Sequence, residues 1–205
     1  MSSSATEAAG IAGLVFLVIA MAALVVLHVA PTGLSPMRDA VSHYGISEYR
    51  SGYRVATIAL GLTGACLVVG LGETISGSGS SLVLILLAVF AVARLIISWF
   101  PMDAPGAQRT ETGRVHGIIA IVTFTAITAA ALRLGAVLSR MALWHSLAPV
   151  TTILGVVMVI CIIGMVLCRS SEAMRERFGL IERGLYVAIL GWCAVFGAAC
   201  AAGVR

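Results

Sequence analysis

The sequence predicts an all-α protein, a single transmembrane domain over residues 1–205 that is built as an integral membrane six-helix bundle. Two observations support this prediction. The chain is 60% hydrophobic and only 11% charged over its 205 residues, whereas soluble domains carry about 25% charged residues. Its apolar residues also fall into runs of the length, about 20 residues, that a helix needs to cross a bilayer.

The six predicted spans cover approximately residues 10–30, 55–72, 82–100, 115–132, 147–168 and 184–204. The first is interrupted only by His28 and ends at Pro31, and a polar, tyrosine-rich segment leads to the second. A Ser/Gly turn precedes the third span, which contains Arg94. The loop 101–114 opens the fourth span, a connection ending at Ser146 opens the fifth, and the charged segment 169–183 opens the sixth. The helical spacing from Glu172 to Glu176 and Arg177 also predicts a short interfacial helix in that segment.

The basic residues, all of them arginine, are distributed unequally between the two ends of such a bundle. With six spans, the first, third and fifth loops share one side, which carries Arg38, Arg50, Arg54, Arg109, Arg114, Arg169, Arg175, Arg177 and Arg183; the other side carries Arg133, Arg140 and Arg205. The positive-inside rule then predicts a multi-pass protein of the cell membrane with the Arg-rich side cytoplasmic and both termini outside. Arginines between apolar spans suit contact with membrane lipids and not with nucleic acid.

Most other strong polar groups are predicted at the same Arg-rich side. We expect a polar pocket there, lined by Arg94, Asp103, His116, Glu182 and Arg183, with Asp39 and Ser42 nearby. Arg94 lies within a span, where an unpaired charge is costly, so a partner such as Asp103 or Glu182 is expected. In this hypothesis Arg94 and Arg183 attract an anionic headgroup, while the two acids position them and one acid bonds His116.

Three other interpretations of these residues remain open. His28, His43, Asp103 and His116 can supply zinc ligands, although no HxxxH or HExxH motif fixes two of them on one helix face. If the protein is an enzyme with such a metal site, its candidate catalytic residues are Asp103, His116 and Ser42. A haem held between His28 and His116 is a further class. Finally, Asp103 lies in a Pro-x-Asp-x-Pro-Gly sequence typical of a turn, where an Asp accepts hydrogen bonds from nearby backbone N–H groups.

Four motifs occur in the chain in a characteristic order: Pro36-x-Arg38-Asp39-x-Val41-Ser42-x-Tyr44, Trp99-Phe100-Pro101-x-Asp103, Gly113-x-x-His116 and Gly179-Leu180-Ile181-Glu182-Arg183. They resemble those of a bacterial and archaeal six-span family catalogued as a domain of unknown function, DUF998, which is distantly similar to DRAM-type membrane proteins. The resemblance implies a six-helix membrane protein and singles out Asp39, Ser42, Asp103, His116, Glu182 and Arg183. Where the family has an acid after the serine, this chain has His43.

The function we expect from these observations is the binding or handling of a lipid headgroup or small molecule at the Arg-rich membrane face, without a cofactor. The first alternative is an intramembrane metal-dependent hydrolase acting on a lipid or amide, with zinc as the possible metal. The second is a structural or assembly subunit with a membrane-protein partner. Glycines in the second and sixth spans suit helix packing within one chain or in a homo-oligomer.

Overall fold

A computed structural model describes residues 3–203, and this part of the chain is all-α and contains no strand. Six of its helices are long and apolar enough to cross a membrane. The α-helices are α1 (Ser3–Val29), α2 (Arg50–Gly72), α3 (Ser80–Ile96), α4 (Glu111–Leu138), α5 (Ala148–Ser170), the short α6 (Glu172–Arg175) and α7 (Phe178–Ala201). Three 3₁₀ turns, η1 (Val41–Ile46), η2 (Ile97–Trp99) and η3 (His145–Leu147), lie in the connections.

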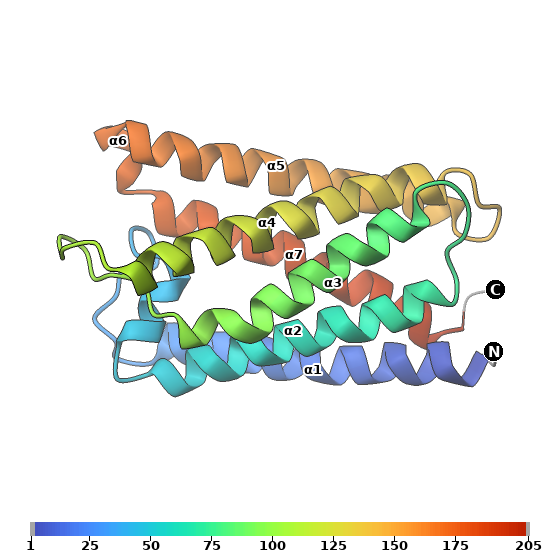
Figure 1. Cartoon of the computed structure of the whole chain (residues 1–205), viewed down its shortest axis with the longest axis horizontal. Coiled ribbons are helices and arrows are strands. Elements are labelled where there is room, and N and C mark those ends of the chain that lie inside the picture. The colour runs from blue at the N-terminus through green and yellow to red at the C-terminus, as the bar shows by residue number, and fades with distance from the viewer. Residues whose placement is uncertain (1–2, 204–205) are drawn as a thin grey trace.

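The six long helices form a closed ring. Each packs against the next along the chain, from α1 through α2, α3, α4 and α5 to α7, and α7 returns to α1. Consecutive helices run in opposite directions, so the loops alternate between the two ends of the bundle (Figure 1). The loop containing η1, the loop before α4 and the segment with α6 therefore gather at one end, which we call the loop end. The predicted grouping of these three loops is confirmed.

The helices extend beyond several of the predicted spans. The fourth span, predicted as 115–132, is part of a helix that runs from Glu111 to Leu138. The first, predicted to begin near residue 10, lies in a helix that already includes Ser3. Hydropathy marks only the residues that suit hydrocarbon, whereas helical hydrogen bonding continues into the polar boundary. The predicted interfacial helix is present as α6, although it is only 4 residues long.

The outer surface of the bundle is apolar. On α5, for example, Ile153 and Ile160 are each 62% exposed. The interior contains large aromatic side chains, including Phe90, Trp192 and Phe196, which are completely buried. Large aliphatic groups on the outside are costly in water and favourable in lipid, so this surface is consistent with a membrane-embedded chain.

Candidate functional site

The loop end is held together by two consecutive residues at the start of α7. Glu182 is buried, and its Oε2 accepts a hydrogen bond from the Val41 backbone N–H at 2.7 Å. Arg183 donates from Nη1 to the Asp39 carbonyl at 2.8 Å and to the Gly179 carbonyl at 3.0 Å. Both side chains thus attach the first loop to α7. Their predicted roles, an arginine facing a headgroup and an acid positioning it, do not describe these contacts.

Arg183 also joins α7 to α1 through His28. Its Nε donates to His28 Nε2 at 2.7 Å, while His28 Nδ1 lies 2.7 Å from the Leu24 carbonyl oxygen. A carbonyl can only accept, so Nδ1 carries the proton and Nε2 is the acceptor. The imidazole is therefore neutral, and both of its nitrogens are engaged. In this arrangement His28 offers neither nitrogen to a metal or to a haem iron.

The glycine of the Gly179-Leu-Ile-Glu-Arg motif has a steric reason. A Cβ built on Gly179 would lie 2.6 Å from the Asp39 carbonyl oxygen and 2.7 Å from the Pro36 carbonyl oxygen. The Leu180 N–H donates to the Met37 carbonyl at 3.0 Å, next to this contact. The first turn of α7 and the backbone of the first loop therefore touch directly, which a side chain at position 179 would prevent.

Asp103 forms part of the helix cap of α4. Its Oδ1 accepts from the Thr110 hydroxyl at 2.7 Å and its Oδ2 from the Thr110 N–H at 3.2 Å. Thr110 is the N-cap residue and accepts from the Gly113 N–H. These hydrogen bonds hold the pKa of Asp103 below its ordinary value. As the turn interpretation expects, Asp103 accepts from a backbone N–H, although that N–H belongs to Thr110, seven residues along the chain. Asp103 forms no hydrogen bond with Arg94.

His116 and Ser42 contact the loop before α4. His116 is buried, and its Nδ1 lies 2.7 Å from the Phe100 carbonyl oxygen, to which it must donate. Its expected hydrogen bond to an acid is thus replaced by one to the backbone. Ser42 donates to the Met102 thioether at 3.0 Å. The two side chains connect η1 and α4 to the same loop.

Arg94 is only 2% exposed. Its Nη1 donates to the Tyr186 hydroxyl at 3.0 Å, and its guanidinium carbon lies 5.2 Å from the centre of the Tyr186 ring. Among the described side chains, those of residues 4–171 and 174–203, no carboxylate lies within 4.0 Å of it. The predicted partner, Asp103 or Glu182, is therefore not in contact with Arg94, and a phenol takes its place.

The candidate metal ligands do not converge. In the parts of the chain with described side chains, 4–171 and 174–203, no three His, Cys, Asp or Glu residues are placed to hold a metal ion. His43 lies with its Nδ1 3.5 Å from Asp39 Oδ1. Its pKa is lowered chiefly by burial and further by Arg183, against the opposing effect of Asp39. The set His28, His43, Asp103 and His116 thus supplies separate structural contacts at the loop end.

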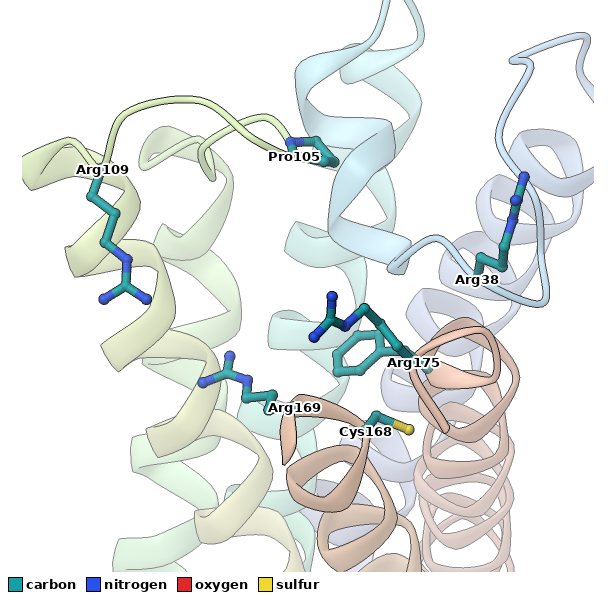
Figure 2. Close-up of a pocket in the computed structure, with 7 residues that line it drawn as sticks. Arg38, Pro105, Arg109, Cys168, Arg169 and Arg175 are labelled. Atoms are coloured by element: carbon teal, nitrogen blue, oxygen red, sulfur yellow. The ribbon is translucent and has the colours of Figure 1, made fainter. Parts of the chain in front are cut away.

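The loop end nevertheless contains a cleft of about 640 Å³, lined by Arg38, Pro105, Arg109, Cys168, Arg169, Arg175 and Phe178. We call it the four-arginine cleft. In Figure 2 the side chains of Arg109, Arg169 and Arg175 extend into one opening, and Arg38 stands at its opposite rim. None of the five residues predicted to line the pocket contributes to it. The cleft lies at the end of the bundle where we expect a pocket, with other residues in its lining.

The cleft has a strong excess of positive charge. Among residues 4–171 and 174–203, whose side chains the structure describes, Arg38 alone of the four arginines is close to an acid, with its Nε 3.6 Å from Glu176 Oε2. Both of these side chains are more than half exposed, so the pair contributes little. Arg169 lies at the end of α5, and Arg175 is the last residue of α6. Their separation of only six residues was the one indication in the sequence that these two arginines could line a common cleft. The sequence does not show which way their side chains turn.

A second cleft of about 440 Å³ opens at the same end and shares no residue with the first. It is lined by Gly45, Ile46, Ser47, Arg50, Arg54, Ser98, Trp99 and Pro101. Arg54 stacks on Trp99, with its guanidinium carbon 5.2 Å from the ring centre. We call this the Arg50–Trp99 cleft.

The ring of six apolar helices and the polar loop end define a multi-pass membrane protein. The profile of a family described as "Protein of unknown function (DUF998)" matches residues 11–199. The chain therefore belongs to this family, as the four motifs indicated. No curated protein and no solved structure matches the chain.

Proposed function

We propose that this protein binds a phosphate-bearing anion in the four-arginine cleft, either the headgroup of a membrane lipid or a soluble small molecule. The observation that carries the proposal is the presence of four arginines from separate segments around one cleft of about 640 Å³. Arginine presents a planar fork of donors that matches phosphate oxygens. An unoccupied cluster of like charges is unfavourable, so a bound anion would relieve the repulsion within it.

The position of the cleft supports an anion that arrives at the membrane surface. The cleft lies where α5 ends and α7 begins, at the boundary of two spans. We propose that the loop end faces the cytoplasm of the cell membrane, because nine of the arginines belong to its loops and entry segments. Anionic lipids of the cytoplasmic leaflet attract such residues with about 1 kcal/mol for each arginine.

Binding can be measured by titrating the detergent-purified protein with short-chain phosphatidylglycerol, short-chain phosphatidylcholine and inorganic phosphate in a calorimeter at low salt. Phosphatidylglycerol binding without phosphate binding identifies a lipid headgroup, and binding of both identifies a phosphate site open to soluble ligands. Removing two charges by Arg169→Gln together with Arg175→Gln should weaken binding by about 2 kcal/mol, roughly 30-fold.

The matched control is Arg140→Gln together with Arg177→Gln, which removes the same charge from two exposed residues that do not line the cleft. It should leave the dissociation constant within about twofold, since its effect is only through screened long-range charge. The proposal is wrong if the two double variants weaken binding equally, or if none of the three probes binds.

A further inference from the structure

We propose that the Arg50–Trp99 cleft is a specific site for one anionic phospholipid, with the phosphate on Arg50 and Arg54 and an acyl chain along α3. This site is separate from the four-arginine cleft and does not rest on the function proposed for it. The two clefts have no residue in common.

The polar part of the site is a set of donors without protein acceptors. Arg50 and Arg54 lie one turn apart at the start of α2, and both are exposed. No carboxylate of residues 4–171 and 174–203 lies within 4.0 Å of either guanidinium. The Ser98 hydroxyl, also in the lining, is buried without a hydrogen-bond partner among the described residues. A phosphate can accept hydrogen bonds from all three side chains.

The start of α2 adds to this preference for an anion. The helix has no side-chain cap at Tyr49, and the positive end of its dipole coincides with the charges of Arg50 and Arg54. Basic residues at a helix N-terminus are unfavourable on their own, because both contributions are positive. A bound phosphate would compensate the dipole and the two guanidinium groups together.

Trp99 keeps one of these arginines in place. The guanidinium of Arg54 stacks over the Trp99 ring, which orders its long side chain but leaves the N–H groups at its edge free. Trp99 is itself 54% exposed, as expected for an aromatic residue at the level of the headgroups. The cleft therefore combines a held guanidinium with an interfacial ring.

The apolar part of the site is a stripe along α3 that ends at the cleft. Its members, spaced alternately by four and three residues, are Ile85, Val89, Val92, Ile96 and Trp99, with exposed fractions between 39% and 59%. Fourteen residues of helix rise about 21 Å, which exceeds the roughly 15 Å of hydrocarbon in one leaflet. An acyl chain can thus follow α3 through a whole leaflet while its phosphate lies in the cleft.

This arrangement favours a lipid over a soluble phosphate as the occupant. A free phosphate would use only Arg50, Arg54 and Ser98, whereas a phospholipid also covers the stripe that continues from the cleft. The net charge of the lining selects an anionic headgroup, since a zwitterionic one would place its ammonium group beside the two arginines.

The chain contains its own reporter for this site. Of its three tryptophans, Trp144 and Trp192 are at most 2% exposed, whereas Trp99 lines the cleft. Lipids with brominated acyl chains quench a tryptophan that they touch. The difference in fluorescence between the wild type and Trp99→Phe isolates the Trp99 signal.

The experiment reconstitutes the protein in phosphatidylcholine vesicles with a minority of phosphatidylglycerol. In one sample the phosphatidylglycerol is brominated, and in the other an equal mole fraction of phosphatidylcholine is brominated. We expect brominated phosphatidylglycerol to quench Trp99 well beyond its mole fraction. Arg50→Gln together with Arg54→Gln should reduce the relative binding of phosphatidylglycerol about tenfold or more.

Two controls separate this site from general surface charge. Arg140→Gln with Arg177→Gln, and Arg169→Gln with Arg175→Gln, should leave the excess quenching unchanged, since none of these residues lines the Arg50–Trp99 cleft. A rise in salt should reduce the excess in the wild type without any substitution. Unchanged circular dichroism and emission from Trp144 and Trp192 show that the variants remain folded.

The inference is overturned if phosphatidylglycerol quenches Trp99 only in proportion to its mole fraction, or if the Arg50/Arg54 variant keeps the excess. Glycerol phosphate added at millimolar concentration distinguishes the source of the ligand. If it abolishes the excess quenching, the phosphate alone accounts for recognition, and the contribution that we assign to the acyl chain along α3 is wrong. Because the double variant Arg169→Gln with Arg175→Gln is measured in parallel, failure of the Arg50–Trp99 site is distinguishable from failure of the four-arginine cleft.

Discussion

Replacing Arg183 by methionine should release the first loop from the bundle. Three of the hydrogen bonds of Arg183 are 3.0 Å or shorter, and their acceptors are His28, the Asp39 carbonyl and the Gly179 carbonyl. A hydrogen bond with a charged donor contributes about 1.5–3 kcal/mol. Three at the lower figure give about 4.5 kcal/mol. Since Arg183 is half-buried and water can replace part of this, we expect the free energy of unfolding to fall by about 3–4 kcal/mol.

The position of the lost contacts makes the effect local as well as global. Arg183 contacts α1 through His28 and the first loop through Asp39, and its Nη2 also lies 3.4 Å from the Tyr44 hydroxyl. In Arg183→Met, residues 32–49 should exchange their amide hydrogens faster and become sensitive to protease. The six long helices, which pack through other surfaces, should keep their circular dichroism signal.

The stability change can be measured by reversible unfolding in mixed micelles of dodecyl maltoside and dodecyl sulfate, followed by circular dichroism. Hydrogen exchange of the loop provides the local measurement. Arg177→Met is the matched control, because Arg177 is exposed and lies only six residues before Arg183 in the chain. Its effect should stay within about 0.5 kcal/mol. A loss of unfolding free energy below 1 kcal/mol in Arg183→Met, with unchanged hydrogen exchange of the loop, would refute the idea that Arg183 holds the first loop to the bundle.

Two further predictions concern polar groups elsewhere in the fold. Trp192 Nε1–H donates to Thr151 Oγ1 at 2.7 Å. Thr151→Val should lower the free energy of unfolding by about 1–3 kcal/mol, because this N–H would be left buried without an acceptor. Thr151→Ser should restore most of the lost stability in the same unfolding assay. His43 has its pKa lowered by burial and by Arg183, so its contribution to stability is complete above the ordinary pKa of about 6.5 and is lost as the pH falls below it. Unfolding measured between about pH 7.5 and pH 5.5 should therefore show a decline with acidification that is smaller in His43→Gln, and equal declines in the two proteins would contradict this.

The fold was predictable because the bilayer imposes one strong requirement on sequence. A spanning helix must be apolar over its crossing length, so the six runs identify the six helices without knowledge of any contact. The parity of the loops then places the arginines at one end. Helix boundaries were less predictable, since Glu111 and the residues that follow are polar yet helical. Their helical state depends on the cap at Thr110, a local contact that hydropathy does not register.

The candidate site was predictable in its location and not in its lining. Hydropathy and charge place both Arg183 and Arg169 at the loop end, but only side-chain direction shows that Arg183 turns inward to the Asp39 carbonyl while Arg169 faces the cleft. Residues in recognisable motifs were favoured as ligand contacts. The Glu182–Arg183 pair instead holds the backbone of the first loop, and Asp103 completes a helix cap. The motif residues thus hold together the end of the bundle at which Arg169 and Arg175 line the four-arginine cleft.

Arg94 adds a buried positive charge to those of the loop end. An arginine keeps its charge when buried, and removing it from water is costly unless its donors are satisfied. Here the hydroxyl and ring face of Tyr186 provide the closest compensation, and Nε has no partner among the described residues. The acid Glu182 also interacts with Arg94 electrostatically, without contacting it. Arg94 lies in α3, one turn before Ser98 of η2. In the phospholipid site that we propose, its positive charge would act on the phosphate together with those of Arg50 and Arg54.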